Sequence, residues 1–125
     1  MSAIIEHDGL VYADSKEAIK AVVRGLIDEA QHDYIVDRRK HHRHSLAILV
    51  RATPIKDGRF GAEFKAITHD IASGGICLVH NSIVNEPYLL LQFPNYNQQP
   101  LVMEVIRQTQ IGPYWMIAGK FRPTC

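Results

Sequence analysis

The sequence predicts a mainly β protein, in which one amphipathic N-terminal helix precedes six short strands that form a small antiparallel barrel or sandwich. Apolar residues recur with the spacing of an amphipathic helix between residues 14 and 33. Six short runs rich in β-forming residues follow, and turn signals such as Asp57-Gly58 and Gly112-Pro113 separate them. The length of 125 residues is typical of one domain with its own hydrophobic core.

The helix is predicted over Asp14–Asp33. Its apolar residues recur at i, i+3, i+4 and i+7, which places them on one helix face. Asp14 and Glu17 have the spacing of a capping box, so Asp14 is the predicted N-cap. A glycine inside a helix costs about 1 kcal/mol relative to alanine, and we therefore expect Gly25 to permit close packing. The apolar face consists of Ile19, Val22, Val23, Leu26, Ile27 and Ala30.

Six strands are predicted after the helix, and glycine, proline or asparagine residues mark most of the turns between them. They are Ser45–Ile55, Phe60–Ile71, Ile76–His80, Tyr88–Phe93, Leu101–Gln110 and Tyr114–Arg122. Short strands joined by turns are typical of a small antiparallel barrel or sandwich. We assign residues 1–34 to an N-terminal extension and residues 35–125 to the barrel domain.

The charge of the chain is unevenly distributed. The whole sequence has 14 Lys and Arg against 13 Asp and Glu, a net charge of +1. Residues 1–34 contain three basic and seven acidic residues (3 − 7 = −4), whereas residues 35–125 contain 11 and six (11 − 6 = +5). Four of those 11 lie between Arg38 and Arg43. This concentration argues against a broad nucleic-acid-binding surface but is compatible with a small anionic ligand.

Compartment signals predict a cytoplasmic protein. The first 30 residues lack the basic and apolar regions of a secretory signal, and no apolar run is long enough for a membrane helix. Two cysteines are too few for a disulfide scaffold. Cys77 lies in an apolar run, which predicts a buried, inert thiol.

Two polar segments are candidates for a binding site. The first, Asp37–His44, contains three arginines, one lysine and three histidines. Arginine has a planar fork that fits phosphate oxygens and the O6/N7 edge of guanine, although most charge runs of this kind are simply solvated. The second, Asp70–Gly75, ends the second predicted strand and by itself is typical of an ordinary turn.

Together, the two segments resemble the paired motifs of the PilZ domain family, bacterial receptors for cyclic di-GMP. Arg39 and Arg43 match the family motif Arg-x-x-x-Arg, and Arg38 precedes it as is frequent in the family. Asp70 and Gly75 match the two ends of the second motif, Asp/Asn-x-Ser-x-x-Gly. The resemblance covers residues 36 to 122. It implies that the six strands form a small six-stranded antiparallel β-barrel of the split-barrel type. It also implies that the protein changes conformation on nucleotide binding and signals to a partner protein.

The resemblance also implies the site residues. The arginines would bind phosphate oxygens and guanine edges, and Arg38 would stack on a base or hold a second ligand molecule. The Asp70 carboxylate would accept hydrogen bonds from guanine N–H groups, and the glycines would let the backbone approach the base. The implied set is Arg38, Arg39, Arg43, Asp70, Ser73, Gly74 and Gly75.

The second motif has one departure from the family pattern. The serine position is Ala72 in this chain, and Ser73 lies one residue late, where alternation along a strand would direct it to the opposite face. One lost neutral hydrogen bond costs about 0.5–1.5 kcal/mol, or up to about tenfold in affinity. The alternative function is therefore a degenerate PilZ-fold interaction module that does not bind nucleotide.

Other functions have weaker support in the sequence. The histidines of the basic segment have no second ligand pair with metal-site spacing, and the pair of Cys77 and His69 is a poor nucleophile candidate because burial is expected for the thiol. We therefore predict a receptor that is not an enzyme and has no cofactor or metal. Single-stranded nucleic acid is not the expected partner, because no aromatic residues interleave with the arginines. The partners expected are cyclic di-GMP and an unidentified effector protein. The helix could cover the barrel, form a homodimer or present a partner surface.

Overall fold

The computed structural model describes residues 6–7, 10–30 and 44–124. In this part of the chain, no helix combines the length and the apolar character needed to cross a membrane. One helix, α1 (Lys16–Ala30), accompanies the strands β1 (Glu6–His7), β2 (Leu10–Val11), β3 (Leu49–Lys56), β4 (Arg59–Phe60), β5 (Phe64–Ala72), β6 (Gly75–His80), β7 (Tyr88–Gln92), β8 (Leu101–Ile111) and β9 (Tyr114–Arg122).

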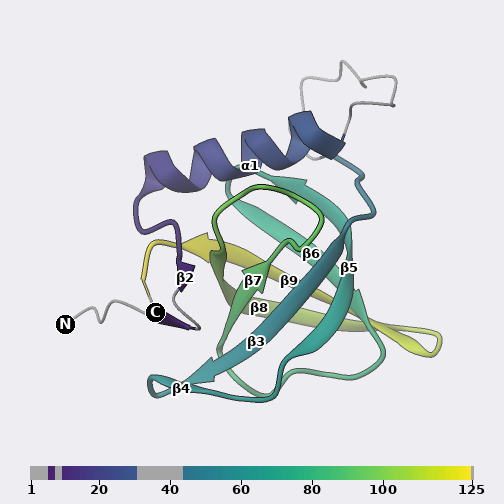
Figure 1. Cartoon of the computed structure of the whole chain (residues 1–125). Coiled ribbons are helices and arrows are strands. Elements are labelled where there is room, and N and C mark those ends of the chain that lie inside the picture. Colours follow the sequence, from purple (N-terminus) through teal and green to yellow (C-terminus); the bar gives the residue numbers. More distant parts are fainter. Residues whose placement is uncertain (1–5, 8–9, 31–43, 125) are drawn as a thin grey trace.

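Six of the strands form a closed antiparallel barrel (Figure 1). The sheet order is β4-β3-β5-β6-β9-β8-β7, and pairing of β3 with β7 closes the barrel while β4 stays outside it. Closure removes most of the unpaired sheet edges that would otherwise be open to other chains. The predicted six-stranded barrel is confirmed. The small hairpin formed by β1 and β2 was not predicted.

The structure confirms the predicted turn at Asp57-Gly58 but changes the bounds of the strands on either side of it. Asp57 and Gly58 have φ values of 53° and 73°, which is the left-handed geometry of a two-residue hairpin turn. Lys56 pairs directly with Arg59 across this turn. The predicted strand Phe60–Ile71 is wrong, because it divides into β4 and β5 on either side of residues 61–63. β3 begins at Leu49, four residues later than predicted.

The N-terminus of the helix also differs from the prediction. Ser15, not Asp14, is the N-cap: its hydroxyl accepts a hydrogen bond from the Ala18 amide at 3.1 Å. Its carbonyl accepts the first helical hydrogen bond, from the Ile19 amide at 2.9 Å. A serine in this position satisfies an amide that the helix itself leaves without a partner.

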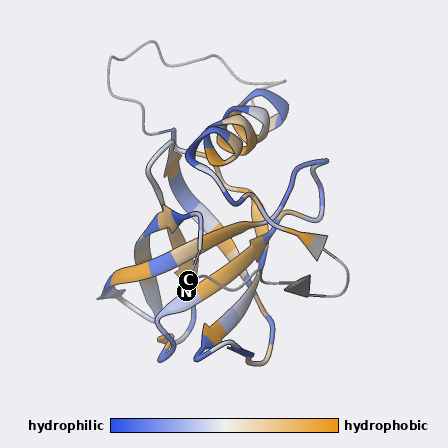
Figure 2. Cartoon of the chain, turned by 90° about the vertical axis from the view of Figure 1, so that its left-hand side faces the viewer, coloured by the Kyte–Doolittle hydropathy of each residue, from blue (hydrophilic) through white to orange (hydrophobic). Residues whose placement is uncertain are grey.

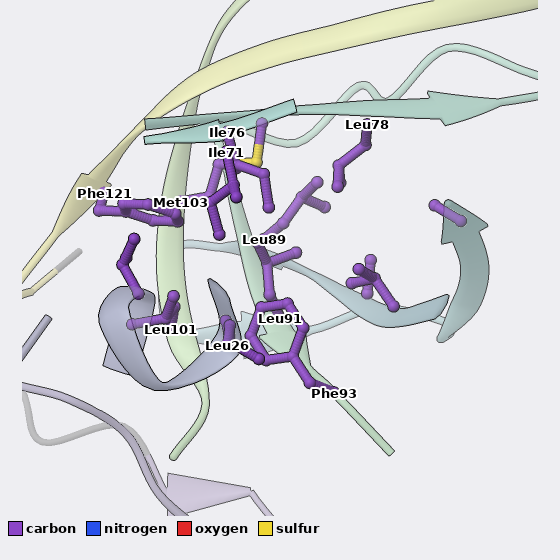
Figure 3. Close-up of a cluster of buried hydrophobic side chains, with 14 of the residues drawn as sticks. Leu26, Ile71, Ile76, Leu78, Leu89, Leu91, Phe93, Leu101, Met103 and Phe121 are labelled. Atoms are coloured by element: carbon purple, nitrogen blue, oxygen red, sulfur yellow. The ribbon is translucent and has the colours of Figure 1, made fainter. Parts of the chain in front are cut away.

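Helix α1 lies across one end of the barrel, and the β3–β4 hairpin lies at the other end (Figure 1). Its buried residues belong to the same hydrophobic cluster as the barrel interior, and Figure 3 shows Leu26 beside Leu91 of β7 and Leu101 of β8. Burying an aliphatic side chain stabilises a fold by about 1.5–3 kcal/mol. The apolar face of the helix thus covers the barrel. The predicted domain boundary between residues 34 and 35 lies outside the described residues.

One edge of α1 is fixed to the loop between β7 and β8. A Cβ at Gly25 would lie 2.3 Å from Nε2 of Gln98, which confirms that this glycine permits close packing. The same Nε2 donates a hydrogen bond of 2.6 Å to Glu29, and the Asn97 amide donates another of 3.3 Å. These contacts fix the rotation of the helix over the barrel. Figure 2 shows hydrophobic residues on the strands and hydrophilic residues in many of the turns.

Candidate functional site

The described residues of the candidate site lie at the β5–β6 hairpin. Asp70 is near the end of β5, Ser73 and Gly74 form the turn, and Gly75 begins β6. The three other predicted residues, Arg38, Arg39 and Arg43, lie outside the described residues.

The residue that follows Arg43 in the sequence is attached to this same hairpin. The His44 amide donates to the Ile71 carbonyl at 2.8 Å, and the Ile71 amide donates to the His44 carbonyl at 3.0 Å. Ile71 is the direct neighbour of Asp70. The sequence neighbours of both predicted motifs therefore meet at β5.

A β-bulge determines the direction of Asp70. Thr68 lies opposite Leu78 and Asp70 lies opposite Cys77, so His69 is an extra residue on β5. An extra residue shifts the alternation of the strand. Ile71, which is fully buried, points into the barrel, and Asp70 and Ala72 flank it on the outer face with partial exposure.

The neighbours of Asp70 form a row across four strands on the outside of the barrel. Asp70 on β5 lies opposite Cys77 on β6, Cys77 opposite Ala118 on β9, and Ala118 opposite Arg107 on β8. Residues directly opposite each other share one face of a sheet. We call these four residues the outer-face row. Its middle is low because cysteine and alanine are small, and its two ends carry a carboxylate and a guanidinium.

The dimensions of the outer-face row suit a planar ring. Strands are about 4.8 Å apart, so the backbones of β5 and β8 are separated by roughly 14 Å along the row. The exposed Arg107 can extend over Ala118 from one end, and Asp70 lies at the other. A flat base lying between them would meet an acceptor on one edge and donors on the other. Sequence reasoning missed Arg107, because only the strand register brings it into line with Asp70.

Among the described residues, His69 and Cys77 are polar neighbours of Asp70. Nδ1 of His69 lies 2.8 Å from Oδ2 of Asp70, and Cys77 is buried, as predicted. The potential ligand atoms of the three residues lie within 4.8 Å of one another, a grouping that the sequence spacing did not predict. Structural zinc sites use four ligands, and among the described residues no fourth His, Cys, Asp or Glu joins this group. The contact between His69 and Asp70 instead orients the carboxylate.

The two glycines of the hairpin differ in what surrounds them. A Cβ added to Gly74 would have no atom within 4 Å, so the tip of the turn is open. A Cβ at Gly75 would lie 2.4 Å from the carbonyl oxygen of Gly119 on β9. Glycine at position 75 is therefore required for the close pairing of β6 and β9, whether or not a ligand binds.

Comparisons with known proteins support the fold but not a closer relationship. The chain matches no known protein-family profile and no curated protein. Among solved structures it is similar to the Bacillus subtilis inhibitor of motility (MotI/DgrA), with a TM-score of 0.50 and 15% identity. It is also similar to the K. pneumonia MrkH–c-di-GMP complex, with a TM-score of 0.51 and 18% identity. Both are PilZ-domain proteins.

The two matches cover most of this chain. The matches include 72% and 70% of it, but only 45% and 46% of the respective neighbours. The chain thus spans less than half the length of the proteins that it resembles. At these identities the similarity establishes the fold.

Proposed function

We propose, from the PilZ fold of this chain, that it is a receptor for cyclic di-GMP and that it is not an enzyme. One observation carries the proposal. The outer-face row places a carboxylate, Asp70, and a guanidinium, Arg107, on either side of two small residues, the buried Cys77 and the partly exposed Ala118. The structure of MrkH, which has the same fold, is that of a c-di-GMP complex.

The chemistry of the ligand fits these groups. Guanine has N–H donors on one edge, and the Asp70 carboxylate would accept hydrogen bonds from them. On another edge it has the acceptors O6 and N7, to which a guanidinium would donate. The two phosphates of the ligand are the partners proposed for Arg39 and Arg43, with Arg38 stacking on a base or holding a second molecule. Ser73, Gly74 and Gly75 complete the proposed set. Hydrogen bonds to charged groups contribute about 1.5–3 kcal/mol each, so the charged residues dominate affinity.

We further propose that binding changes the conformation of the protein and that an effector protein recognises the change. A degenerate interaction module that does not bind nucleotide is the second candidate. Ala72 is the specific observation that favours it, because it lies on the same outer face as Asp70 and carries no hydroxyl. A homodimer would need a surface other than the buried face of α1.

Isothermal titration of the full chain with cyclic di-GMP tests the proposal. We expect binding to the wild type and a loss of at least tenfold in Arg39→Ala/Arg43→Ala and in Asp70→Asn. The control is Lys56→Ala/Arg59→Ala, which removes two exposed cations at the end of the barrel away from α1. No binding at about 100 µM ligand, equivalent to about −5.5 kcal/mol, would overturn the proposal. If thermal melting also shows no nucleotide-dependent shift, the interaction module is the better description.

A further inference from the structure

A groove separates α1 from the β5–β6 hairpin. Two adjoining cavities of about 330 Å³ and 230 Å³ form it, and Lys20 and Ser73 line both of them. Val23 and Ile19 contribute apolar surface from the helix, and Gly74 lines the groove from the tip of the hairpin. We call this feature the α1 groove.

The rim of the α1 groove is basic. Lys16, Lys20 and Arg24 follow one another at intervals of four residues, so they lie along one edge of the helix, and all three are exposed. Arg122 also lines the groove, but it already pairs with Glu104 at 2.7 Å. Within the part of the chain that the structure describes, no carboxylate lines either cavity.

This arrangement is not expected from the composition of the extension. Residues 1–34 have seven acidic residues and only three basic ones, yet all three basic residues line this groove. The contacts of Glu29 with Gln98 and Asn97 hold another edge of the helix against the β7–β8 loop. The rotation of the helix that follows from those contacts directs its cations to the β5–β6 hairpin.

We infer that the α1 groove binds a phosphate of cyclic di-GMP, so that α1 is itself part of the receptor site. This inference rests on the proposed function. Ser73 and Gly74 belong both to the predicted nucleotide motif and to the groove, so a ligand bound at the hairpin lies next to the basic edge of the helix. Lys20 and Arg24 supply cations for a phosphate, and Val23 supplies apolar surface for a base or sugar.

The inference gives α1 a role in signalling. A ligand phosphate held by both Lys20 and the Ser73 turn would link the helix to the barrel through contacts that the free protein lacks. Ligands that bind one state stabilise that state by mass action. In the ligand-bound protein, α1 would therefore separate from the barrel less often, and hydrogen exchange of the α1 amides would slow.

The test compares two double variants of the full chain by titration with cyclic di-GMP. Lys20→Ala/Arg24→Ala removes the helix cations, and Lys56→Ala/Arg59→Ala removes the same charge at the other end of the barrel. We expect affinity to fall by about ten- to a hundredfold in the helix variant and by less than about twofold in the control. Alanine favours helices, and both positions are exposed, so the free variant should melt like the wild type. If it melts lower, Lys20→Gln/Arg24→Gln replaces it.

Each outcome separates this inference from the proposed function. Wild-type binding with unchanged affinity in the helix variant, or an equal loss in helix variant and control, overturns the inference and leaves the receptor function standing. Absence of wild-type binding overturns both. A selective loss in the helix variant supports the inference, and ligand-dependent slowing of hydrogen exchange in α1 that disappears in this variant supports it independently.

Discussion

Restoring the missing hydroxyl of the second motif should strengthen nucleotide binding. Ala72 is partly exposed, lies opposite Gly75 on β6, and is on the same outer face as Asp70, with the buried Ile71 between them. The substitution Ala72→Ser therefore places a hydroxyl two residues from the carboxylate, on the face where the ligand is proposed to bind. Serine is only one oxygen larger than alanine, so the strand pairing should persist.

The expected gain follows from the energy of one neutral hydrogen bond. Such a bond contributes about 0.5–1.5 kcal/mol, which corresponds to about two- to twelvefold tighter binding at 25 °C. Titration of wild type and Ala72→Ser with cyclic di-GMP at a fixed salt concentration measures the difference. Ala62→Ser is the matched control, because Ala62 is exposed in the segment between β4 and β5. We expect no change in its affinity.

An unchanged dissociation constant in Ala72→Ser would refute this reasoning. Ser73→Ala then identifies the cause. If the Ser73 hydroxyl already donates the bond, its removal weakens wild-type binding by up to about tenfold. If neither variant changes affinity, no hydroxyl at this hairpin contacts the ligand.

Three further experiments test the site and the core. Arg107→Ala should weaken cyclic di-GMP binding about tenfold in a titration, and an unchanged affinity would remove Arg107 from the site. Chemical denaturation should show that replacing two buried threonines by valine has different effects on the free energy of unfolding. Thr53→Val should leave stability unchanged or raise it by up to about 1 kcal/mol, because the described residues offer the Thr53 hydroxyl no hydrogen-bond partner. Thr68→Val should cost about 2–4 kcal/mol, because that hydroxyl donates to the Leu46 carbonyl and accepts from the Ile48 amide. A loss in Thr53→Val equal to that in Thr68→Val would contradict the argument. In a Gln98→Ala background, Gly25→Ala should stabilise the protein by about 1 kcal/mol, since the clash with Gln98 is then removed.

Periodicity was sufficient to predict the helix and the number of barrel strands. Helices and strands each place apolar side chains toward the core at a characteristic spacing, and that spacing can be read directly from the sequence. The predicted N-cap was wrong by one residue, because Asp14 and Ser15 are adjacent and both are good capping residues. The structure identifies Ser15, because its carbonyl accepts the first helical hydrogen bond. The division between β4 and β5 was missed because Phe60, Ala62, Phe64 and Ala66 alternate as they would in one continuous strand.

The site could be predicted only where its residues are close in sequence. Asp70, Ser73, Gly74 and Gly75 form one motif, and the structure places them in one hairpin. Arg107 is far from that motif and joins the outer-face row only through the register of β8 on β9 and of β9 on β6. Each of these registers depends on pairing across the whole barrel, and the bulge between Val105 and Arg107 shifts one of them by a residue. Local sequence contains no signal for that.

The β5–β6 hairpin is the element that connects the proposed contacts. Its β5 strand carries Asp70 toward Arg107 across the outer-face row, and its turn carries Ser73 toward Lys20 in the α1 groove. The backbone pairing of His44 with Ile71 joins the end of the basic segment to the same strand. A ligand held at this hairpin would therefore be within reach of both the barrel and the N-terminal helix. The buried face of α1 belongs to the same hydrophobic core as the barrel. A ligand that stabilises the packing of α1 on the barrel therefore also stabilises the barrel core. The effect of binding can in this way reach surfaces that the nucleotide does not touch.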